Sequence, residues 1–271
     1  MSYSLILAGC GKMGSALLSG WLDRGIKSSD ITVIEPFKKT ASKITKNFNV
    51  TVVSNPSHIP ENKNARVIVF AIKPQSMDES IVEYANFVDK KTVFLSIAAG
   101  KTTDYFQSNL SIRAAIVRAM PNTPAAVGRG ITVTFANANT TNAQIKKCNE
   151  LLKAVGTVVQ IENEELMDAI TALSGSGPAY VFALTECMAN AGVRAGLPIE
   201  LANRLARETV AGAGELLYRT SESACELRKN VTSPGGTTAA ALEILLAKGN
   251  LKELMVRAIS SATKRSQELA K

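Results

Sequence analysis

Histidine, aromatic residues and paired cysteines are scarce in this chain of 271 residues. His58 is the only histidine, and the four cysteines form no C-x-x-C pair and no zinc-ligand spacing, so no metal is expected. Aromatic residues make up 5% of the chain, and its lysines and arginines are scattered, so the formal charge of +8 does not predict nucleic-acid binding. No apolar run reaches the roughly 18 residues of a membrane span, so no membrane partner is expected either.

The same scarcities predict a cytoplasmic protein. The N-terminus lacks the basic region and the small-residue cleavage site of a secretory signal. Cysteines without a pairing pattern are typical of reduced thiols. The length favours about two domains, and a hydrophobic fraction of 46% is ample for real cores.

A glycine motif follows the first apolar run of the chain. Residues 4–8 predict a short buried strand, Gly9–Gly14 has the pattern G-x-G-x-x-G, and helical spacing follows. In this context the first glycine permits a tight turn, the second lets the backbone approach a pyrophosphate, and the third lets the helix pack closely. A second predicted strand, 31–34, ends at Glu35, where an acidic group can bind an adenosine ribose. The predicted dinucleotide-binding residues here are Ala8, Gly9, Cys10, Gly11, Lys12, Met13, Gly14 and Glu35.

The first part of the chain alternates strand-like and helical patterns. Further β-branched runs lie at 50–53, 66–70, 92–96, 112–118, 131–135 and 157–161, and amphipathic stretches lie at 37–47, 75–87 and 142–154. This alternation predicts right-handed crossovers in an α/β fold with a doubly wound, mostly parallel sheet. The run at 131–135 has no convincing helix before it, so an antiparallel addition is expected there.

Strand-like runs stop near residue 162. Helical patterns follow at 164–173, 178–195, 199–218, 222–229, 238–248 and 250–270. We therefore expect a dinucleotide-binding domain at 1–162 and an all-helical domain at 163–271. Segment 178–195 is apolar nearly all round, and a domain of about 110 residues has little interior to hide it. A subunit interface is favoured over a central core helix.

A second glycine loop, Ser233–Thr238, precedes one of these helices. Its sequence, S-P-G-G-T-T, has two glycines followed by an expected helix N-terminus, where unpaired N–H groups and the helix dipole favour an anion. The loop lacks the lysine of a phosphate-binding P-loop, so a small carboxylate is the better expected ligand.

Six segments, taken in order, resemble the pyrroline-5-carboxylate reductase family over essentially the whole chain. They are Gly9–Gly14, Ala71–Pro74 (A-I-K-P), Ser96–Gly100 (S-I-A-A-G), Arg118–Pro124 (R-A-M-P-N-T-P), Leu173–Tyr180 (L-S-G-S-G-P-A-Y) and Ser233–Thr238. The resemblance implies a Rossmann-type sheet followed by a helical substrate-binding and dimerisation domain. It also implies reduction of 1-pyrroline-5-carboxylate to L-proline by hydride transfer from NADPH or NADH, the last step of proline biosynthesis.

The resemblance assigns further site residues. It places Asn55 near the adenosine half of the cofactor, and Ala71, Ile72, Lys73, Pro74, Ile97, Ala98 and Ala99 along the nicotinamide half. It places the substrate carboxylate on Ser233, Gly236, Thr237 and Thr238, and we expect the Thr238 hydroxyl to bond the ring nitrogen and so to be the catalytic contact. A homodimer assembled into a larger ring, such as a decamer, is implied as well.

Two alternatives stay open on the sequence. Glu35 favours NADH because it repels a 2′-phosphate, whereas Lys38 and Lys39 just beyond it favour NADPH. The rival functions are a β-hydroxyacid dehydrogenase-like enzyme and a non-catalytic dinucleotide-binding protein. The first rival requires a catalytic lysine on the helix after Ser174–Gly177, and this helix has none there. The second rival gives no role to Ser233–Thr238, which is called the threonine loop below.

Overall fold

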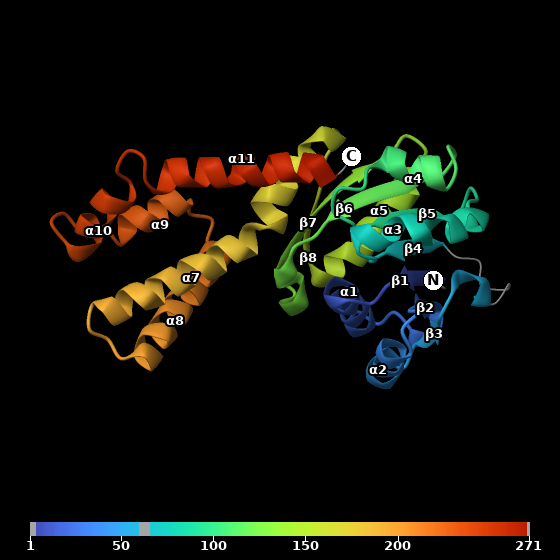
Figure 1. Cartoon of the computed structure of the whole chain (residues 1–271), viewed down its shortest axis with the longest axis horizontal. Helices are drawn as coiled ribbons and strands as arrows, with labels where there is room; N and C mark the ends of the chain where they lie inside the picture. The colour runs from blue at the N-terminus through green and yellow to red at the C-terminus, as the bar shows by residue number, and fades with distance from the viewer. Residues whose placement is uncertain (1–3, 60–65, 270–271) are drawn as a thin grey trace. The chain divides into compact units, whose positions relative to one another are not determined.

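The computed structural model describes residues 4–59 and 66–269 (Figure 1). By its internal contacts the chain divides into two compact units. The first unit contains the described residues up to Gly175 together with those from Ala262 onward, and the second contains Ser176–Ser261.

One sheet of eight strands forms the first unit. The strands follow the order β3-β2-β1-β4-β5-β6-β7-β8, and each neighbouring pair is parallel except β6 and β7, which are antiparallel. This confirms the expected doubly wound α/β sheet and the antiparallel addition. The strands are β1 (Leu5–Ala8), β2 (Ile31–Ile34), β3 (Thr51–Val53), β4 (Val67–Phe70), β5 (Val93–Ser96), β6 (Ile116–Met120), β7 (Gly130–Ala136) and β8 (Gly156–Gln160).

Both faces of the sheet are covered, because alternate strand residues point to opposite sides. On one face Leu5 and Leu7 pack with Trp21 of α1 (Lys12–Asp23) and with α5 (Asn142–Leu152). On the other face Ile6 and Ala8 belong to a cluster with Phe70, whose ring stacks on Phe106 and meets the edge of Tyr84. Apolar residues on both faces of β1 explain why its sequence, L-I-L-A, shows no polar alternation.

The helices between the strands of the first unit depart from expectation in two places. The stretch 75–87 is not one α-helix but a 3-10 turn (Pro74–Ser76), a short α3 (Met77–Ser80) and a 3-10 helix (Ile81–Phe87). This tighter winding still buries Met77, Ile81 and Tyr84. Helix α4 (Thr103–Asn109) was not expected, while α2 (Lys38–Phe48) and the 3-10 turn at Lys153–Val155 after α5 follow the pattern.

The last strand ends at Gln160, close to the expected end of the first domain, but the compact units divide later, at Gly175. Between these points lie a 3-10 turn (Glu164–Leu166), α6 (Met167–Ile170) and one π-helical turn (Thr171–Gly175), where one continuous helix was expected. A Cβ on Gly175 would lie 2.3 Å from the Met120 side chain of β6, so this segment packs directly on the sheet.

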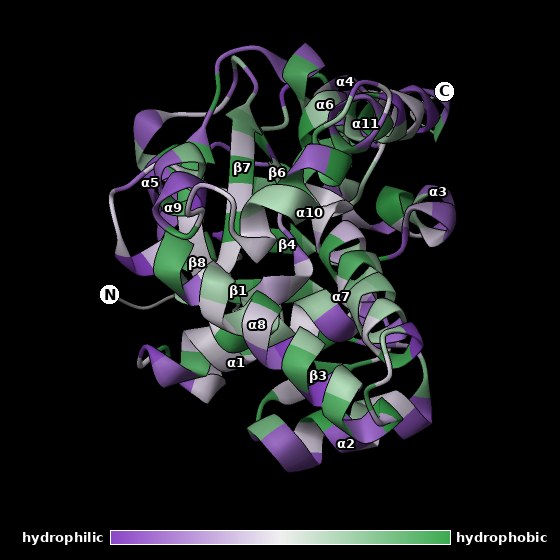
Figure 2. Ribbon diagram, turned by 90° about the vertical axis from the view of Figure 1, so that its left-hand side faces the viewer, coloured by the Kyte–Doolittle hydropathy of each residue, from purple (hydrophilic) through white to green (hydrophobic). Residues whose placement is uncertain are grey.

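The second unit is helical. It contains α7 (Gly177–Arg194), α8 (Ile199–Arg219), α9 (Ala224–Asn230), α10 (Thr237–Leu245) and part of α11 (Leu251–Leu269). Helices α7 and α8 approach closely because small residues lie between them, with Ala189, Ala202 and Ala206 buried. Hydrophobic residues cover several turns of both helices (Figure 2). On α7, 62% of Phe182 is exposed. In the described part of the chain, no helix is both long and apolar enough to cross a membrane.

Candidate active site

A cleft of about 570 Å³ opens at the carboxyl ends of β1, β2, β3 and β4. Parallel α/β sheets bind ligands at this edge, where the strand order reverses about β1. Eight residues predicted to bind the cofactor line the cleft: Gly9, Cys10, Gly11, Glu35, Asn55, Ala71, Ile72 and Lys73. The other eight predicted cofactor residues do not line it: Ala8, Lys12, Met13, Gly14, Pro74, Ile97, Ala98 and Ala99.

The three motif glycines meet different surroundings. Gly9 has a φ of +82°, and a Cβ there would lie 2.8 Å from the Ala71 carbonyl oxygen. A Cβ on Gly14 would lie 2.7 Å from the Gly9 carbonyl oxygen. A Cβ on Gly11 would meet nothing within 4 Å, although Gly11 caps the N-terminus of α1. Gly9 and Gly14 therefore serve the turn and its packing, while Gly11 leaves the open space that an anion at a helix N-terminus needs.

Glu35 lies where β2 leaves the sheet. Its N–H donates to the Val53 carbonyl of β3 at 2.9 Å, and its Oε1 accepts the N–H of Phe37 at 3.1 Å. The residue is 7% exposed yet lines the cleft. The strand end and the turn thus fix a carboxylate at the position where such folds hold the adenosine ribose.

The sequence did not predict a second carboxylate in the cleft. Glu83, in the 3-10 helix after α3, accepts a hydrogen bond from the Asn55 side-chain amide at 2.5 Å. The spacing of Ser76, Ser80 and Glu83 gave the available signal, because these polar residues recur at i, i+4 and i+7 and so share one face of a helical pattern. All three line the cleft.

Cys10 is unsuited to nucleophilic chemistry. Burial raises the pKa of its thiol, and the nearby Glu35 charge raises it further, although a contact with the Ser15 hydroxyl at 3.5 Å acts in the opposite direction. The thiol therefore stays protonated at neutral pH and acts as a small apolar group.

The loop after β5 is held from several sides. The Ile97 N–H donates to the Phe70 carbonyl at 3.1 Å, and the Ala98 N–H donates to the Ser96 hydroxyl at 3.2 Å. Ala98 itself is buried. Further on, Lys101 forms an ion pair with Asp78 at 2.7 Å and lies 4.0 Å from the centre of the Tyr105 ring.

A nearly buried ion pair anchors the helix that follows this loop. The Arg118 guanidinium contacts Glu164 Oε1 at 2.9 Å, with 6% and 19% of their side chains exposed. Glu164 also accepts the Thr103 backbone N–H at 2.9 Å and the Thr103 hydroxyl at 2.6 Å. This carboxylate, distant in sequence, caps the first turn of α4 and joins β6 to the segment after β8.

The threonine loop lies in the second unit. Gly235 adopts a φ of +68°, the Gly236 N–H closes a turn onto the Ser233 carbonyl at 3.0 Å, and α10 begins at Thr237. The first N–H groups of a helix have no intrahelical acceptor, so those of Thr237 and Thr238 remain available to an anion. Ser233 is exposed and Thr238 is half-buried. The structure thus confirms the turn and the helix start, with no Lys in the loop.

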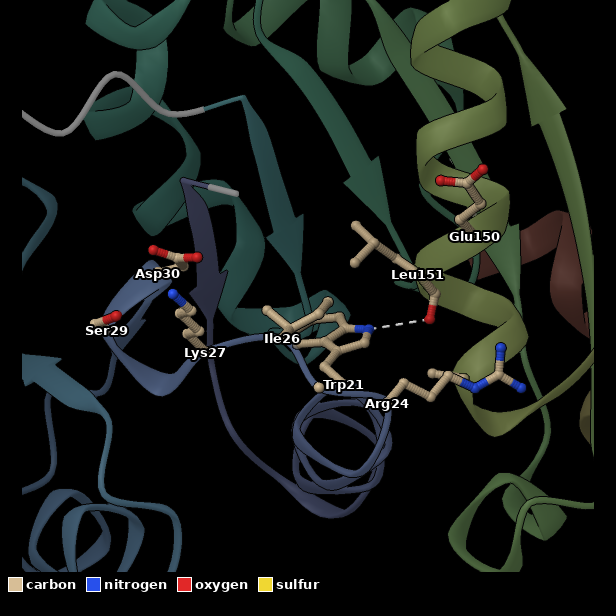
Figure 3. A pocket seen from close by; sticks show the side chains of 10 residues that line it. Trp21, Arg24, Ile26, Lys27, Ser29, Asp30, Glu150 and Leu151 are labelled. Atoms are coloured by element: carbon tan, nitrogen blue, oxygen red, sulfur yellow. Dashed lines mark hydrogen bonds between the residues drawn. The ribbon is translucent and has the colours of Figure 1, made fainter. Parts of the chain in front are cut away.

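A larger hollow, of about 660 Å³, lies near the opposite edge of the sheet (Figure 3). Exposed side chains of both charges line it, including Arg24, Lys27 and Glu150. The Trp21 indole at its base is buried and donates to the Leu151 carbonyl at 3.0 Å. No residue singled out in the sequence for binding or catalysis lies here. Over residues 4–59 and 66–269, no group of three histidine, cysteine or acidic side chains is placed to hold a metal.

Comparison with known proteins decides the family. A model described as pyrroline-5-carboxylate reductase dimerisation matches residues 164–269, and one described as NADP oxidoreductase, coenzyme F420-dependent, matches residues 5–100. The pyrroline-5-carboxylate reductase of Synechocystis sp. is 38% identical over all of both chains. That of Pseudomonas aeruginosa is 36% identical over 97% of this chain and 95% of its own. The chain belongs to the pyrroline-5-carboxylate reductase family.

Solved structures agree with this assignment. A pyrroline-5-carboxylate reductase from Coxiella burnetii superposes with a TM-score of 0.92 at 33% identity and covers all of both chains. A pyrroline carboxylate reductase from Plasmodium falciparum, solved with NADP bound, superposes with a TM-score of 0.83 at 29% identity over 99% of this chain and 98% of its own. The predicted family, fold class, enzyme class and nicotinamide-nucleotide cofactor are confirmed.

Proposed function

We propose that this chain reduces 1-pyrroline-5-carboxylate to L-proline with NADPH or NADH, the last step of proline biosynthesis. The single observation that carries the proposal is the pairing of two sites in one family member: a dinucleotide cleft at Gly9–Gly14 and an unblocked helix N-terminus at Ser233–Thr238. The first fits a nucleotide cofactor and the second a small carboxylate.

Residues of 1–162 hold the cofactor in this proposal. Gly11, at the N-terminus of α1, would leave room for the pyrophosphate, and Glu35 and Asn55 would hold the adenosine half. The backbone after β4, at Ala71–Pro74, and after β5, at Ile97–Ala99, would hold the nicotinamide half. When bound, the cofactor supplies the hydride; the protein's part is to orient it and to exclude water.

Residues of 163–271 hold the substrate and form the dimer. Ser233, Gly236, Thr237 and Thr238 contact the carboxylate, mostly through backbone N–H groups, and the Thr238 hydroxyl bonds the ring nitrogen. The hydride adds to the imine carbon, and the C=N electron pair moves to nitrogen, which already carries a proton when the imine enters protonated. No histidine, paired carboxylate or metal is required of the chain.

We propose a homodimer, built into a larger ring such as a decamer. Exposed apolar residues on α7, including Phe182, Leu184 and Met188, support it, as does the dimerisation model that matches this part of the chain. Light scattering is expected to give at least twice the chain mass at low micromolar concentration. A stable, active monomer would contradict the proposal.

We place the protein in the cytoplasm, on the grounds of its unpaired cysteines.

In the decisive test the protein is mixed with racemic pyrroline-5-carboxylate and either NADPH or NADH. The absorbance of the reduced nicotinamide at about 340 nm is then followed over time. Consumption of the cofactor with stoichiometric formation of L-proline supports the proposal. Turnover of a 3-hydroxy acid with NAD(P) would favour a β-hydroxyacid dehydrogenase-like enzyme instead. Cofactor binding without turnover of either substrate would favour a non-catalytic role.

A further inference from the structure

The adenosine end of the cleft carries negative charge from two directions. Glu35 directly follows the last residue of β2. Glu83 accepts a hydrogen bond from Asn55, which follows β3, the strand beside β2. Both carboxylates line the cleft. One oxygen of Glu35 accepts the Phe37 N–H, which leaves the carboxylate with acceptor capacity for the two hydroxyls of a ribose.

Within the described residues, Lys73 is the only lysine or arginine that lines this cleft. It follows β4, whereas Glu35 follows β2, and β1 lies between these two strands. Two strand spacings separate them by about 10 Å, which is roughly a Debye length at moderate ionic strength. Lys73 thus follows a strand on the far side of β1 from Glu35, and this one cation shares the cleft lining with two carboxylates, Glu35 and Glu83.

Lys38 and Lys39, the residues that favoured a 2′-phosphate on the sequence, occupy the first positions of α2. Both are exposed, and Phe37 and Thr40 line the cleft from this segment instead. The N–H of Phe37 is engaged by Glu35, so the turn presents a carboxylate to the ribose in place of a donor.

We propose that Glu35, with Glu83 as a second carboxylate, makes this enzyme selective for NADH over NADPH. This inference rests on the proposed use of the cleft as the adenosine site. A 2′-hydroxyl donates a hydrogen bond to Glu35, whereas a 2′-phosphate carries about 1.5–2 negative charges against it. The cofactor expected for this enzyme, NADH, thus differs from the NADP bound in the Plasmodium falciparum structure.

The test measures binding by calorimetry with two probes that differ only at the 2′ position, ADP and adenosine 2′-phosphate 5′-diphosphate. Wild-type protein is expected to bind ADP at least about tenfold more tightly, and kcat/KM is expected to favour NADH over NADPH by a similar factor. The variants are Glu35→Gln, Glu83→Gln and the double variant Lys38→Ala with Lys39→Ala. Unfolding midpoints in urea check that each variant is folded.

Glu35→Gln is expected to reduce the preference for ADP by about tenfold, Glu83→Gln to reduce it less, and the double lysine variant to leave it unchanged. Equal or tighter binding of the 2′-phosphorylated probe to wild type would overturn the selectivity and leave the proposed function intact. So would a loss of that probe's affinity in the double lysine variant. Failure of both probes to bind would overturn the adenosine site itself, and the proposed function with it.

Discussion

Replacing motif glycines one at a time separates the glycine that serves the ligand from those that serve the fold. At Gly11 the backbone is extended, with φ −72° and ψ −160°, and a Cβ would meet nothing within 4 Å. Gly11→Val therefore costs only the difference between glycine and valine as a helix cap, about 1 kcal/mol or less. At Gly14 a Cβ would lie 2.7 Å from a backbone oxygen and 3.3 Å from the Ala71 Cβ. Gly14→Val is expected to lower the free energy of unfolding by about 1–3 kcal/mol or more.

The effects on cofactor binding have a different origin. A valine at Gly11 occupies the space through which the pyrophosphate approaches the first turn of α1. A hydrogen bond to a charged group contributes about 1.5–3 kcal/mol, so the loss of one raises the Kd of ADP-ribose roughly 10- to 150-fold. Urea unfolding measures the stability of both variants, and calorimetry measures the affinity. Two results would refute this reasoning. In one, the Gly11→Val variant binds ADP-ribose with a Kd within about twofold of wild type; in the other, it unfolds at as low a urea concentration as Gly14→Val.

Three further predictions concern other parts of the chain. Thr238→Ala is expected to lower kcat/KM for pyrroline-5-carboxylate about ten- to a thousand-fold, or about 1.4–4 kcal/mol, at a stability cost of about 0.5–2 kcal/mol, while Thr238→Ser recovers much of the activity. Near-normal kcat/KM in Thr238→Ala would show that the Thr238 hydroxyl serves only the start of α10 and does not orient the substrate. Glu164→Ala leaves the nearly buried Arg118 cation unpaired, so urea unfolding should show a loss of about 3–5 kcal/mol, and adding Arg118→Met should restore part of it. No restoration in the double variant would mean that the pair is not the cause. The hydrogen bonds and charge of Lys101, with the bond from Tyr105, lower the pKa of Asp78 in the folded state, so this carboxylate adds stability above its unfolded pKa of about 3.9 and loses it as pH falls through the lower folded value. Urea midpoints measured from neutral pH into acid should therefore fall less steeply in Asp78→Asn, and an unchanged slope would contradict the assignment.

Strand positions were predictable where burial is continuous. The runs 31–34 and 66–70 coincide with β2 and β4 to within a residue, because β-branched runs between turns have few alternatives. The run 112–118 begins four residues before β6, Ile116–Met120. Ile112 is apolar but 76% exposed, and pairing with β5 starts only at Ile116, opposite Phe94. Composition gives no sign of where a neighbouring strand begins.

Features that depend on tertiary contacts were missed for the same reason. The sequence around α4, T-D-Y-F-Q-S-N, is short and polar, and its helix is capped by Thr102 and by Glu164, which lies 61 residues beyond Thr103. Glu83 enters the cleft through its bond to Asn55, 28 residues away. The glycine motif predicted the turn because all its parts are local, whereas no local pattern records which distant carboxylate completes a cap or a pocket.

Net charge and local charge lead to opposite expectations for the cofactor. The formal charge of +8 favours the more anionic ligand at long range, and so raises the rate at which any phosphorylated cofactor meets the protein. Discrimination between two cofactors that share everything but a 2′-phosphate depends instead on groups within about 8–10 Å of that one atom, because salt screens the rest. Glu35, held by its own turn, and Glu83 line this end of the cleft, whereas Lys38 and Lys39 at the start of α2 are exposed and do not line it. A basic protein can thus present an acidic ribose site, and the selectivity follows the site.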